Sequence, residues 1–248
     1  MTARRWTTRR PRIVGVIASR EDLEEALRMG RAPDLFELRL DRLTGVVDLV
    51  ENNLAKLRAP LIITARHPNE GGSGKLSLRQ RRALLSRFLS RADYLDIELR
   101  SARALRELLA IAKTKNVRRI ISFHDFKSTP RSKLLVAKAI NAKALRADIF
   151  KVATRTDTPI ELGRLLDLMT NSGVNLPLAV MGIGKLGAIS RVVLARAGSA
   201  LVYASVRNAT DIEGQLSLEQ LRELGIGPRQ KRNVIPSEVE ESRRITFR

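Results

Sequence analysis

Short apolar segments alternate with longer amphipathic segments along most of the chain. The apolar segments predict strands at 12–19, 34–40, 61–66, 94–99, 119–124, 148–153, 177–181 and 200–206. The intervening segments predict helices at 21–29, 45–57, 77–90, 102–115, 132–146, 159–169, 186–197 and 217–224, with Ser19 as a cap of the first. Because short buried strands that alternate with helices are joined by parallel crossovers, this pattern predicts an α/β protein.

The number of strand–helix units narrows the fold further. Eight units in one stretch predict a closed (β/α)8 TIM barrel as a single domain over residues 12–224. The alternative is an open doubly wound sheet. No G-x-G-x-x-G follows the first strand and no Walker lysine motif occurs, which disfavours that alternative. Residues 1–11 form a basic N-terminal tail, and residues 225–248 form an extension that we expect to be mobile.

Polar residues recur on one face of five consecutive predicted strands. Alternation along each strand groups Glu37, Arg39 and Asp41; Thr64 and Arg66; Asp96 and Glu98; Ser122 and His124; and Lys151. Since helices cover the outside of a barrel, the polar face must be the lumen. A lumen with a purely structural role is filled mostly by branched aliphatic residues. The pattern therefore favours a functional pocket, with a self-satisfied network of ion pairs as the alternative.

Lys151 lies inside the apolar segment 147–154. A lysine in a buried strand is costly unless it is paired or used. Burial favours the neutral amine, which is a nucleophile toward carbonyl groups. The alternative is a lysine that reaches water or pairs with a carboxylate. His124, on the preceding strand, is a candidate general acid or base, whereas His67 should point away from the lumen and be structural.

Three loops are expected at the mouth of the pocket. Glu70 opens the glycine-rich loop after the third strand and is close enough to reach the lumen. Residues 181–191 combine glycines with a helix N-terminus, which suits an anionic group, and Arg191 could clamp a carboxylate. Residues 211–215 follow the last strand and could fold over the pocket.

Composition limits the partners and the location of the protein. The net charge of +20 favours anionic ligands and nucleic acid alike. The charge is spread along the chain and aromatic residues make up only 4%, so we expect no nucleic-acid partner. The absence of cysteine excludes disulfides, thiolate metal sites and cysteine nucleophiles. With no apolar run of about 18 residues and no secretory signal, we expect a soluble, cytoplasmic protein without a membrane partner.

Several segments, taken in order, resemble one known family, the type I 3-dehydroquinate dehydratases, Schiff-base-forming lyases of the shikimate pathway of aromatic amino-acid biosynthesis. The matching segments are ELRLD at 37–41, TARHPNEGG at 64–72, SFHDF at 122–126, FKVA at 150–153, GAISR at 187–191 and GQ at 214–215. The resemblance implies a (β/α)8 fold, no metal, no cofactor and a homodimer.

The resemblance also implies a role for each matching residue. It makes Lys151 the Schiff-base lysine, His124 the general acid/base and Glu70 the carboxylate that orients the histidine. The implied substrate-binding residues are Glu37, Arg39, Arg66, Arg191 for the substrate carboxylate and Gln215 on a lid. The chain departs from the family at this lid, since NATDIEGQ replaces A-S/T-A-P-G-Q. The contact that the family's lid hydroxyl makes is therefore either lost or made by a displaced residue. The two candidates for that residue are Thr210 and Asp211.

The implied reaction is the syn elimination of water from 3-dehydroquinate, an anionic small molecule, to give 3-dehydroshikimate. A class I aldolase-type lyase that acts on another anionic keto substrate is the alternative, since it also uses a barrel lysine. A nucleic-acid binder and an inactive scaffold are the alternatives from other classes. The pairing of Lys151 with His124 and the carboxylate-binding Arg191 favour the dehydratase over the aldolase. The scattered charge and the polar lumen speak against a nucleic-acid binder, and the intact lysine and histidine disfavour an inactive scaffold.

Overall fold

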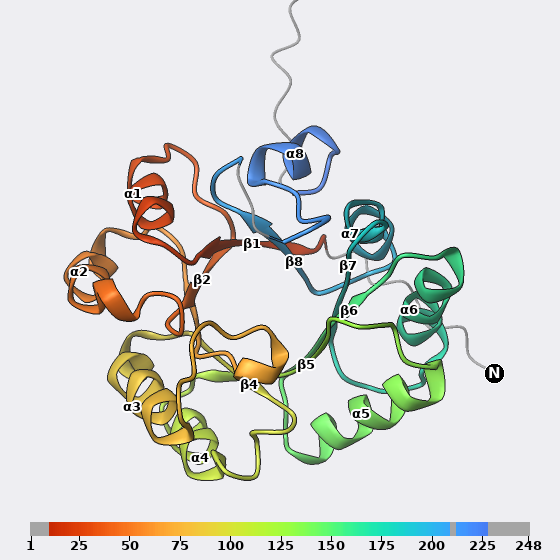
Figure 1. The fold of residues 1–248 in the computed structure, drawn as a ribbon, viewed down its shortest axis with the longest axis horizontal. Coiled ribbons are helices and arrows are strands. Elements are labelled where there is room, and N and C mark those ends of the chain that lie inside the picture. The colour runs from red at the N-terminus through yellow and green to blue at the C-terminus, as the bar shows by residue number, and fades with distance from the viewer. Residues whose placement is uncertain (1–9, 209–211, 228–248) are drawn as a thin grey trace, which may run out of the picture.

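The computed structural model describes residues 10–208 and 212–227. Its strands are β1 (Arg12–Ile17), β2 (Leu35–Arg39), β3 (Leu61–Thr64), β4 (Tyr94–Glu98), β5 (Arg118–Asp125), β6 (Ile149–Arg155), β7 (Leu178–Ile183) and β8 (Leu201–Ser205). They form an eight-stranded sheet in the order β7-β6-β5-β4-β3-β2-β1-β8, and the paired strands are parallel. The sheet curls into a barrel (Figure 1), so the predicted (β/α)8 fold is confirmed.

The barrel closes where β7 approaches β8. The strand order leaves β7 and β8 at the two ends of the sheet. At this seam the Ala200 amide, just before β8, donates a 2.7 Å hydrogen bond to the Leu178 carbonyl oxygen.

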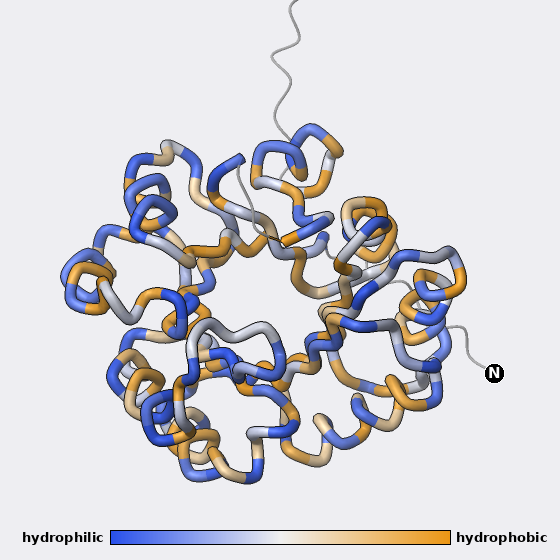
Figure 2. Tube along the Cα trace, in the orientation of Figure 1, coloured by the Kyte–Doolittle hydropathy of each residue, from blue (hydrophilic) through white to orange (hydrophobic). Residues whose placement is uncertain are grey.

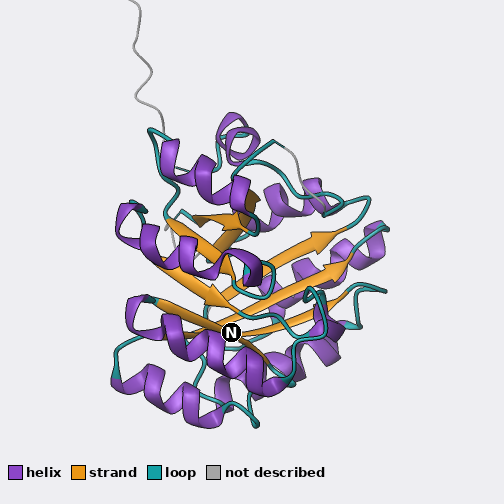
Figure 3. Cartoon of the chain, turned by 60° about the vertical axis from the view of Figure 1, so that its left-hand side comes forward, coloured by secondary structure: helices purple, strands orange, loops and turns teal. Residues whose placement is uncertain are grey.

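The helices cover the outside of the barrel (Figure 3). They are α1 (Arg20–Arg28), α2 (Val47–Asn53), α3 (Leu78–Phe88), α4 (Arg106–Thr114), α5 (Ser132–Ala144), α6 (Pro159–Asn171), α7 (Gly187–Arg196) and α8 (Leu218–Glu223). The Ser19 hydroxyl accepts a hydrogen bond from the Asp22 amide, so the predicted cap is present.

Two of the predicted helices differ from the structure. The helix predicted at 45–57 is a short α2 flanked by the 3₁₀ turns Thr44–Val46 and Leu54–Lys56. The helix predicted from 102 begins only at Arg106, because residues 99–105 form turns after β4. In that segment Ala102 and Leu105 are buried, so their apolar character serves packing rather than helix formation.

Apolar residues form two separate clusters. The outward-facing strand residues pack with the helices in a continuous outer core that includes Phe36, Leu38 and Phe150. A second cluster fills the lumen near the strand N-termini and includes Val14, Leu35, Ile62, Ile120 and Ile149. The strands accordingly run through hydrophobic positions, whereas the helices alternate between hydrophobic and hydrophilic ones (Figure 2). Polar lumen residues begin near the middle of the strands, with Glu37, Asp96 and Lys151, and continue toward the carboxyl ends, where barrel enzymes carry their chemistry.

Within the described ranges, no helix combines the length and the apolar character that crossing a membrane requires. The N-terminal tail and the C-terminal extension that the sequence analysis distinguished lie almost entirely outside the described residues.

Candidate active site

The amine of Lys151 lies in a layer of charged side chains inside the barrel. Lys151 is in β6, where it pairs in register with Ser122 of β5, and only 4% of the residue is exposed. Its Nζ donates to Glu37 Oε1 of β2 at 3.2 Å and to Asp96 Oδ2 of β4 at 3.1 Å. Side chains from β2, β4 and β6 therefore meet at the amine of Lys151.

An aromatic ring from β8 lies against the same amine. The centre of the Tyr203 ring is 3.8 Å from Lys151 Nζ, which is a cation–π distance. Burial raises the pKa of the Tyr203 phenol well above its usual value, and the carboxylates of Glu37 and Asp96 raise it further. The phenol therefore stays protonated, and the ring presents an uncharged face to the amine.

Arg66, immediately after β3, connects the carboxylates of this layer. Its guanidinium donates to both oxygens of Asp96, at 3.0 and 2.9 Å, and to Ser122 Oγ at 2.6 Å. Burial alone would lower the pKa of Arg66, but Asp96 and Glu98 raise it well above the usual value. Burial likewise opposes ionisation of Asp96, yet Arg66 and Lys151 hold its pKa far below the usual range. Both groups are therefore charged at neutral pH.

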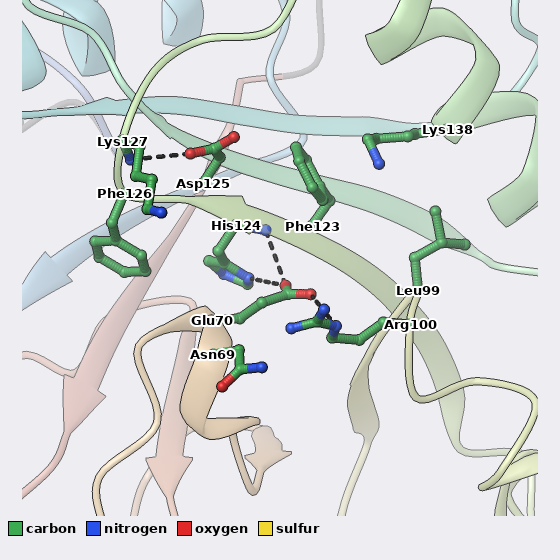
Figure 4. Close-up of a pocket in the computed structure, with 10 residues that line it drawn as sticks. All are labelled: Asn69, Glu70, Leu99, Arg100, Phe123, His124, Asp125, Phe126, Lys127 and Lys138. Carbon is green, nitrogen blue, oxygen red and sulfur yellow. Dashed lines mark hydrogen bonds and ion pairs between the residues drawn. The ribbon is translucent and has the colours of Figure 1, made fainter.

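His124 and Glu70 form a second cluster beside this layer (Figure 4). The carboxylate oxygen Oε2 of Glu70 accepts the His124 backbone amide at 2.9 Å and lies 3.1 Å from His124 Nδ1. Glu70 ends the 3₁₀ turn Pro68–Glu70, which is followed by Gly71 at φ +84°. A Cβ at Gly71 would lie 2.5 Å from Phe126 Cζ, so the turn packs directly on the residues that follow β5.

Burial sets the ionisation of this pair. The pKa of His124 lies well below its usual value because of burial and the positive charges of Arg66 and Lys151. Burial and the charge of Glu98 raise the pKa of Glu70 to about 7. The imidazole is therefore neutral at neutral pH. When Glu70 is ionised it can accept only from an Nδ1–H, which leaves Nε2 as the basic nitrogen.

A cavity of about 450 Å³ adjoins the pair. Its walls combine cationic and apolar side chains with both members of the pair: Asn69, Glu70, Leu99, Arg100, Phe123, His124, Asp125, Phe126, Lys127 and Lys138 (Figure 4). Arg100 lies 3.8 Å from the other carboxylate oxygen of Glu70. The pair is thus accessible from outside the barrel while its immediate surroundings are buried.

Arg39 and Arg191, both predicted to bind substrate, are held by protein groups in the structure. Arg39 pairs with Asp41 at 2.9 Å and donates to the Gly71 carbonyl oxygen at 3.0 Å. Arg191 is 3% exposed, and burial lowers its pKa to about 10. Its Nη1 and Nε donate to four carbonyl oxygens, those of Gly182, Gly187, Gly214 and Tyr203. Arg191 thereby joins the β7–α7 turn to the loop after β8.

Gln215 lies in that loop, and its backbone N–H donates to the Ile212 carbonyl oxygen at 3.0 Å. Thr210 and Asp211, the two candidates for the displaced lid hydroxyl, lie outside the described residues. The His67 side chain caps the 3₁₀ turn Pro68–Glu70, because its Nδ1 accepts the Asn69 backbone amide, while the His67 backbone amide donates to Glu98 Oε1 at 2.8 Å.

Asp96, Tyr203 and Arg81 are three buried residues of the site for which the sequence predicted no role. Strand alternation had already placed Asp96 in the lumen, and the same alternation along 200–206 would have placed Tyr203 there. Arg81 gave no such signal, because it lies on α3 and reaches inward to Glu98 Oε2 at 2.5 Å. Among the described residues, no three histidine, aspartate or glutamate side chains are grouped so as to hold a metal ion.

A parallel (β/α)8 barrel whose lumen holds a buried amine and an ionised carboxylate, with an imidazole toward the carboxyl end of the neighbouring strand, is a barrel enzyme. The chain belongs to the type I 3-dehydroquinase family, whose model matches residues 14–225. It is therefore a carbon–oxygen lyase of the 3-dehydroquinate dehydratase kind.

Relatives agree with this assignment. The chain is 32% identical over 214 residues to the 3-dehydroquinate dehydratase of Methanocella arvoryzae, covering 86% of this chain and 94% of the relative. The structure of 3-dehydroquinate dehydratase from Geobacillus kaustophilus matches with a TM-score of 0.77 and 28% identity, over 86% of this chain and 89% of that one. The type I enzyme from Clostridium difficile, solved with covalent modified comenic acid, matches with a TM-score of 0.76 and 27% identity, over 87% and 90%.

Proposed function

We propose that the enzyme dehydrates 3-dehydroquinate to 3-dehydroshikimate through a Schiff base on Lys151, with His124 as general acid and base. The observation that carries the proposal is the amine of Lys151, buried in the lumen between carboxylates, with the His124 imidazole on the same face of the neighbouring strand. The covalent modified ligand in the Clostridium difficile relative supports covalent chemistry in this family.

Imine formation begins at the amine. The neutral amine of Lys151 attacks the C3 ketone, the carbonyl oxygen leaves as water, and an iminium forms at Nζ. Glu37, 3.2 Å from Nζ, is placed to take the proton that the amine must lose before attack. Asp96 is held ionised by Arg66, so it remains as a negative charge that stabilises the iminium.

Elimination then depends on His124. The iminium withdraws electrons from C2, and the neutral imidazole removes a C2 proton. The C2–H electron pair forms the C1=C2 double bond, the C1–O bond breaks, and the hydroxyl leaves as water with the proton that His124 returns. Hydrolysis of the imine releases the product. General acid–base help of this kind contributes roughly 10²–10⁴-fold.

Substrate binding uses the cations around the lumen. We propose that Arg39 and Arg66 bind substrate together with Glu37, that Arg191 takes the substrate carboxylate, and that Gln215 contacts ring hydroxyls from the loop after β8. The four bonds from Arg191 to carbonyl oxygens use its Nε and Nη1, so we propose that a substrate carboxylate binds through Nη2.

Borohydride trapping tests the proposal. The enzyme is treated with sodium borohydride in the presence of 3-dehydroquinate, digested and mapped by mass spectrometry. We expect a reduced adduct on Lys151, and no adduct in Lys151→Met. An adduct on another lysine, or turnover by Lys151→Met, would contradict the mechanism.

The two histidines provide a matched pair for the second step. We expect His124→Ala to form the trapped adduct while its kcat falls by roughly 10²–10⁴-fold, because only the proton transfer is lost. His67→Ala should lower kcat far less, since it removes only the side-chain cap of the turn Pro68–Glu70 and keeps the backbone bond to Glu98. Normal turnover by His124→Ala would exclude this residue as the proton carrier.

We also propose that the enzyme works in the cytoplasm as a homodimer, as the resemblance to the family implies. The proposal rests on that resemblance, and α5 also exposes two large apolar residues, Leu134 and Ile140, which are 50% and 55% exposed. Sedimentation equilibrium tests the dimer, and a monomer at micromolar concentration would contradict it.

A further inference from the structure

The lumen has one charged wall and one mostly apolar wall. The charged side chains come from β2 to β6, whereas β7, β8 and β1 present mostly apolar residues such as Met181, Ile183 and Val16. Two hydroxyls interrupt this apolar wall, those of Tyr203 and Ser205. Both belong to β8 and, two residues apart, lie on the same lumen face.

These two hydroxyls lack hydrogen-bond partners. Among the described residues, Tyr203 Oη and Ser205 Oγ are the buried side-chain polar atoms for which the structure shows no partner. Buried hydroxyls are nearly always paired, because leaving one unpaired costs its desolvation. Even without a partner for its hydroxyl, Tyr203 makes a contact that uses its aromatic ring, because the ring lies against Lys151 Nζ. The side chain of Ser205 offers little beyond its hydroxyl, so alanine would fit there without the cost.

The backbone holds Ser205 in this orientation. Its amide donates to the Leu216 carbonyl oxygen at 3.0 Å, and the residue pairs with Val16 on one side and bridges to Ser217 on the other. Ser205 therefore cannot turn its side chain away from the lumen. It is 7% exposed and is the last residue of β8, so it lies nearer the open end of the barrel than Tyr203 does.

We infer that Ser205 is a substrate-binding residue whose hydroxyl pairs with a ring hydroxyl of the bound substrate. The inference rests on the proposed function, in which the substrate is a cyclic keto acid with several hydroxyls. A ligand held by charges from β2 to β6 turns its other edge toward β8, where polar partners are scarce. The serine hydroxyl rotates to donate or accept, so it matches a hydroxyl in either role.

Steady-state kinetics of Ser205→Ala test the inference. We expect KM for 3-dehydroquinate to rise roughly tenfold, the value of one neutral hydrogen bond, with kcat within about twofold of wild type. The melting temperature should stay the same or rise, because an unpaired hydroxyl is removed. An analogue that lacks the ring hydroxyl facing β8 should bind wild type and Ser205→Ala equally.

Ser199→Ala is the matched control at the opposite end of β8. The Ser199 hydroxyl accepts the Val180 amide at 3.0 Å and donates to the Leu201 carbonyl oxygen at 2.9 Å. Its loss should lower the melting temperature and leave KM unchanged. An unchanged KM in Ser205→Ala, or an equal rise in Ser199→Ala, would overturn the inference. Failure of the wild type to dehydrate 3-dehydroquinate would instead overturn the proposed function.

Discussion

At the scale of single residues, burial rather than local sequence sets the chemistry of Glu70. Its carboxyl group is 6% exposed and has a pKa of about 7, so it changes charge within the physiological range. When ionised it fixes the tautomer of His124. The protonation states of Glu70, in a loop, and His124, in a strand, are therefore linked.

Glu70→Gln should change how stability depends on pH. A carboxyl whose folded pKa is raised above its ordinary value of 4.5 favours folding most in acid, and this contribution is lost as pH rises from about 4.5 to 7. Glutamine does not ionise, so the variant does not lose stability in this way as pH rises. The free energy of unfolding of the variant minus that of wild type should be about 2 to 3 kcal/mol larger at pH 8 than at pH 5. Urea unfolding at the two pH values measures this, and equal differences would refute the raised pKa.

The sequence predicted the lumen residues better than their partners. Alternation within strands placed Glu37, Asp96 and Lys151 on one face, because a two-residue period leaves no other choice. The ion pairs among them depend on side-chain reach across the barrel, which no local pattern encodes. The bonds from Arg191 to four carbonyl oxygens were likewise invisible, since they need the positions of two loops.

At the scale of elements, the β7–α7 turn and the loop after β8 touch through glycines. A Cβ at Gly214, whose φ is +76°, would lie 2.5 Å from the Gly184 carbonyl oxygen and 2.6 Å from Gly187 Cα. The backbone of the loop that carries Gln215 therefore lies in direct contact with the backbone of the turn. Arg191 donates hydrogen bonds to carbonyl oxygens of both segments.

Gly214→Ala should displace this loop. Both the positive φ and the contact with Gly184 oppose a side chain, so we expect a loss of about 1–3 kcal/mol in the free energy of unfolding and a higher KM. Gly163→Ala is the control. Gly163 lies within α6 with open space around it, so alanine should stabilise the helix by about 0.5–1 kcal/mol and leave KM unchanged. Urea unfolding and initial rates on both variants check the contrast.

Element boundaries show where sequence patterns stop being informative. Every predicted strand and helix is present, because each carries its own hydrophobic period. The predicted helix at 45–57 was too long, and the helix predicted from residue 102 begins only at Arg106. Part of their apolar residues packs on the core from the 3₁₀ turns that flank α2 and from the turns that precede α4, and a periodic pattern cannot distinguish such turns from a helix.

At the scale of the whole molecule, one network of buried charges crosses the barrel wall. Arg81 of α3 donates to Glu98 Oε2 and to the Ala65 carbonyl oxygen, and Glu98 in turn pairs with Arg66 in the lumen. The outer helices are therefore connected to the charged layer by ionic contacts as well as by apolar packing.

Two adjacent arginines test the weight of this network. Arg81→Met leaves a buried carboxylate with one partner fewer and should lower the free energy of unfolding by about 3–5 kcal/mol. Arg82→Met removes a surface pair with Glu107, in which both side chains are about half exposed or more, and should change it by less than about 1 kcal/mol. Urea unfolding at one pH compares them, and equal effects would show that the network adds no stability.

The fold as a whole was the most predictable feature, because eight repeats of one unit leave few topologies. What the repeat could not show is how the lumen divides into an apolar lower part, a charged wall and a wall with two unpaired hydroxyls. That division depends on which strand faces which across the barrel.

The close fit of Phe126 over Gly71 has one more consequence. Because the Phe126 ring leaves no room for even a methyl group over Gly71, the turn that holds Glu70 and the segment that follows His124 are in direct contact. Glu70 and His124 are thus held together by this packing as well as by their hydrogen bonds. The opposite rim, residues 212–216, is joined to the β7–α7 turn through glycine backbone and Arg191, so different kinds of contact hold the two sides of the mouth.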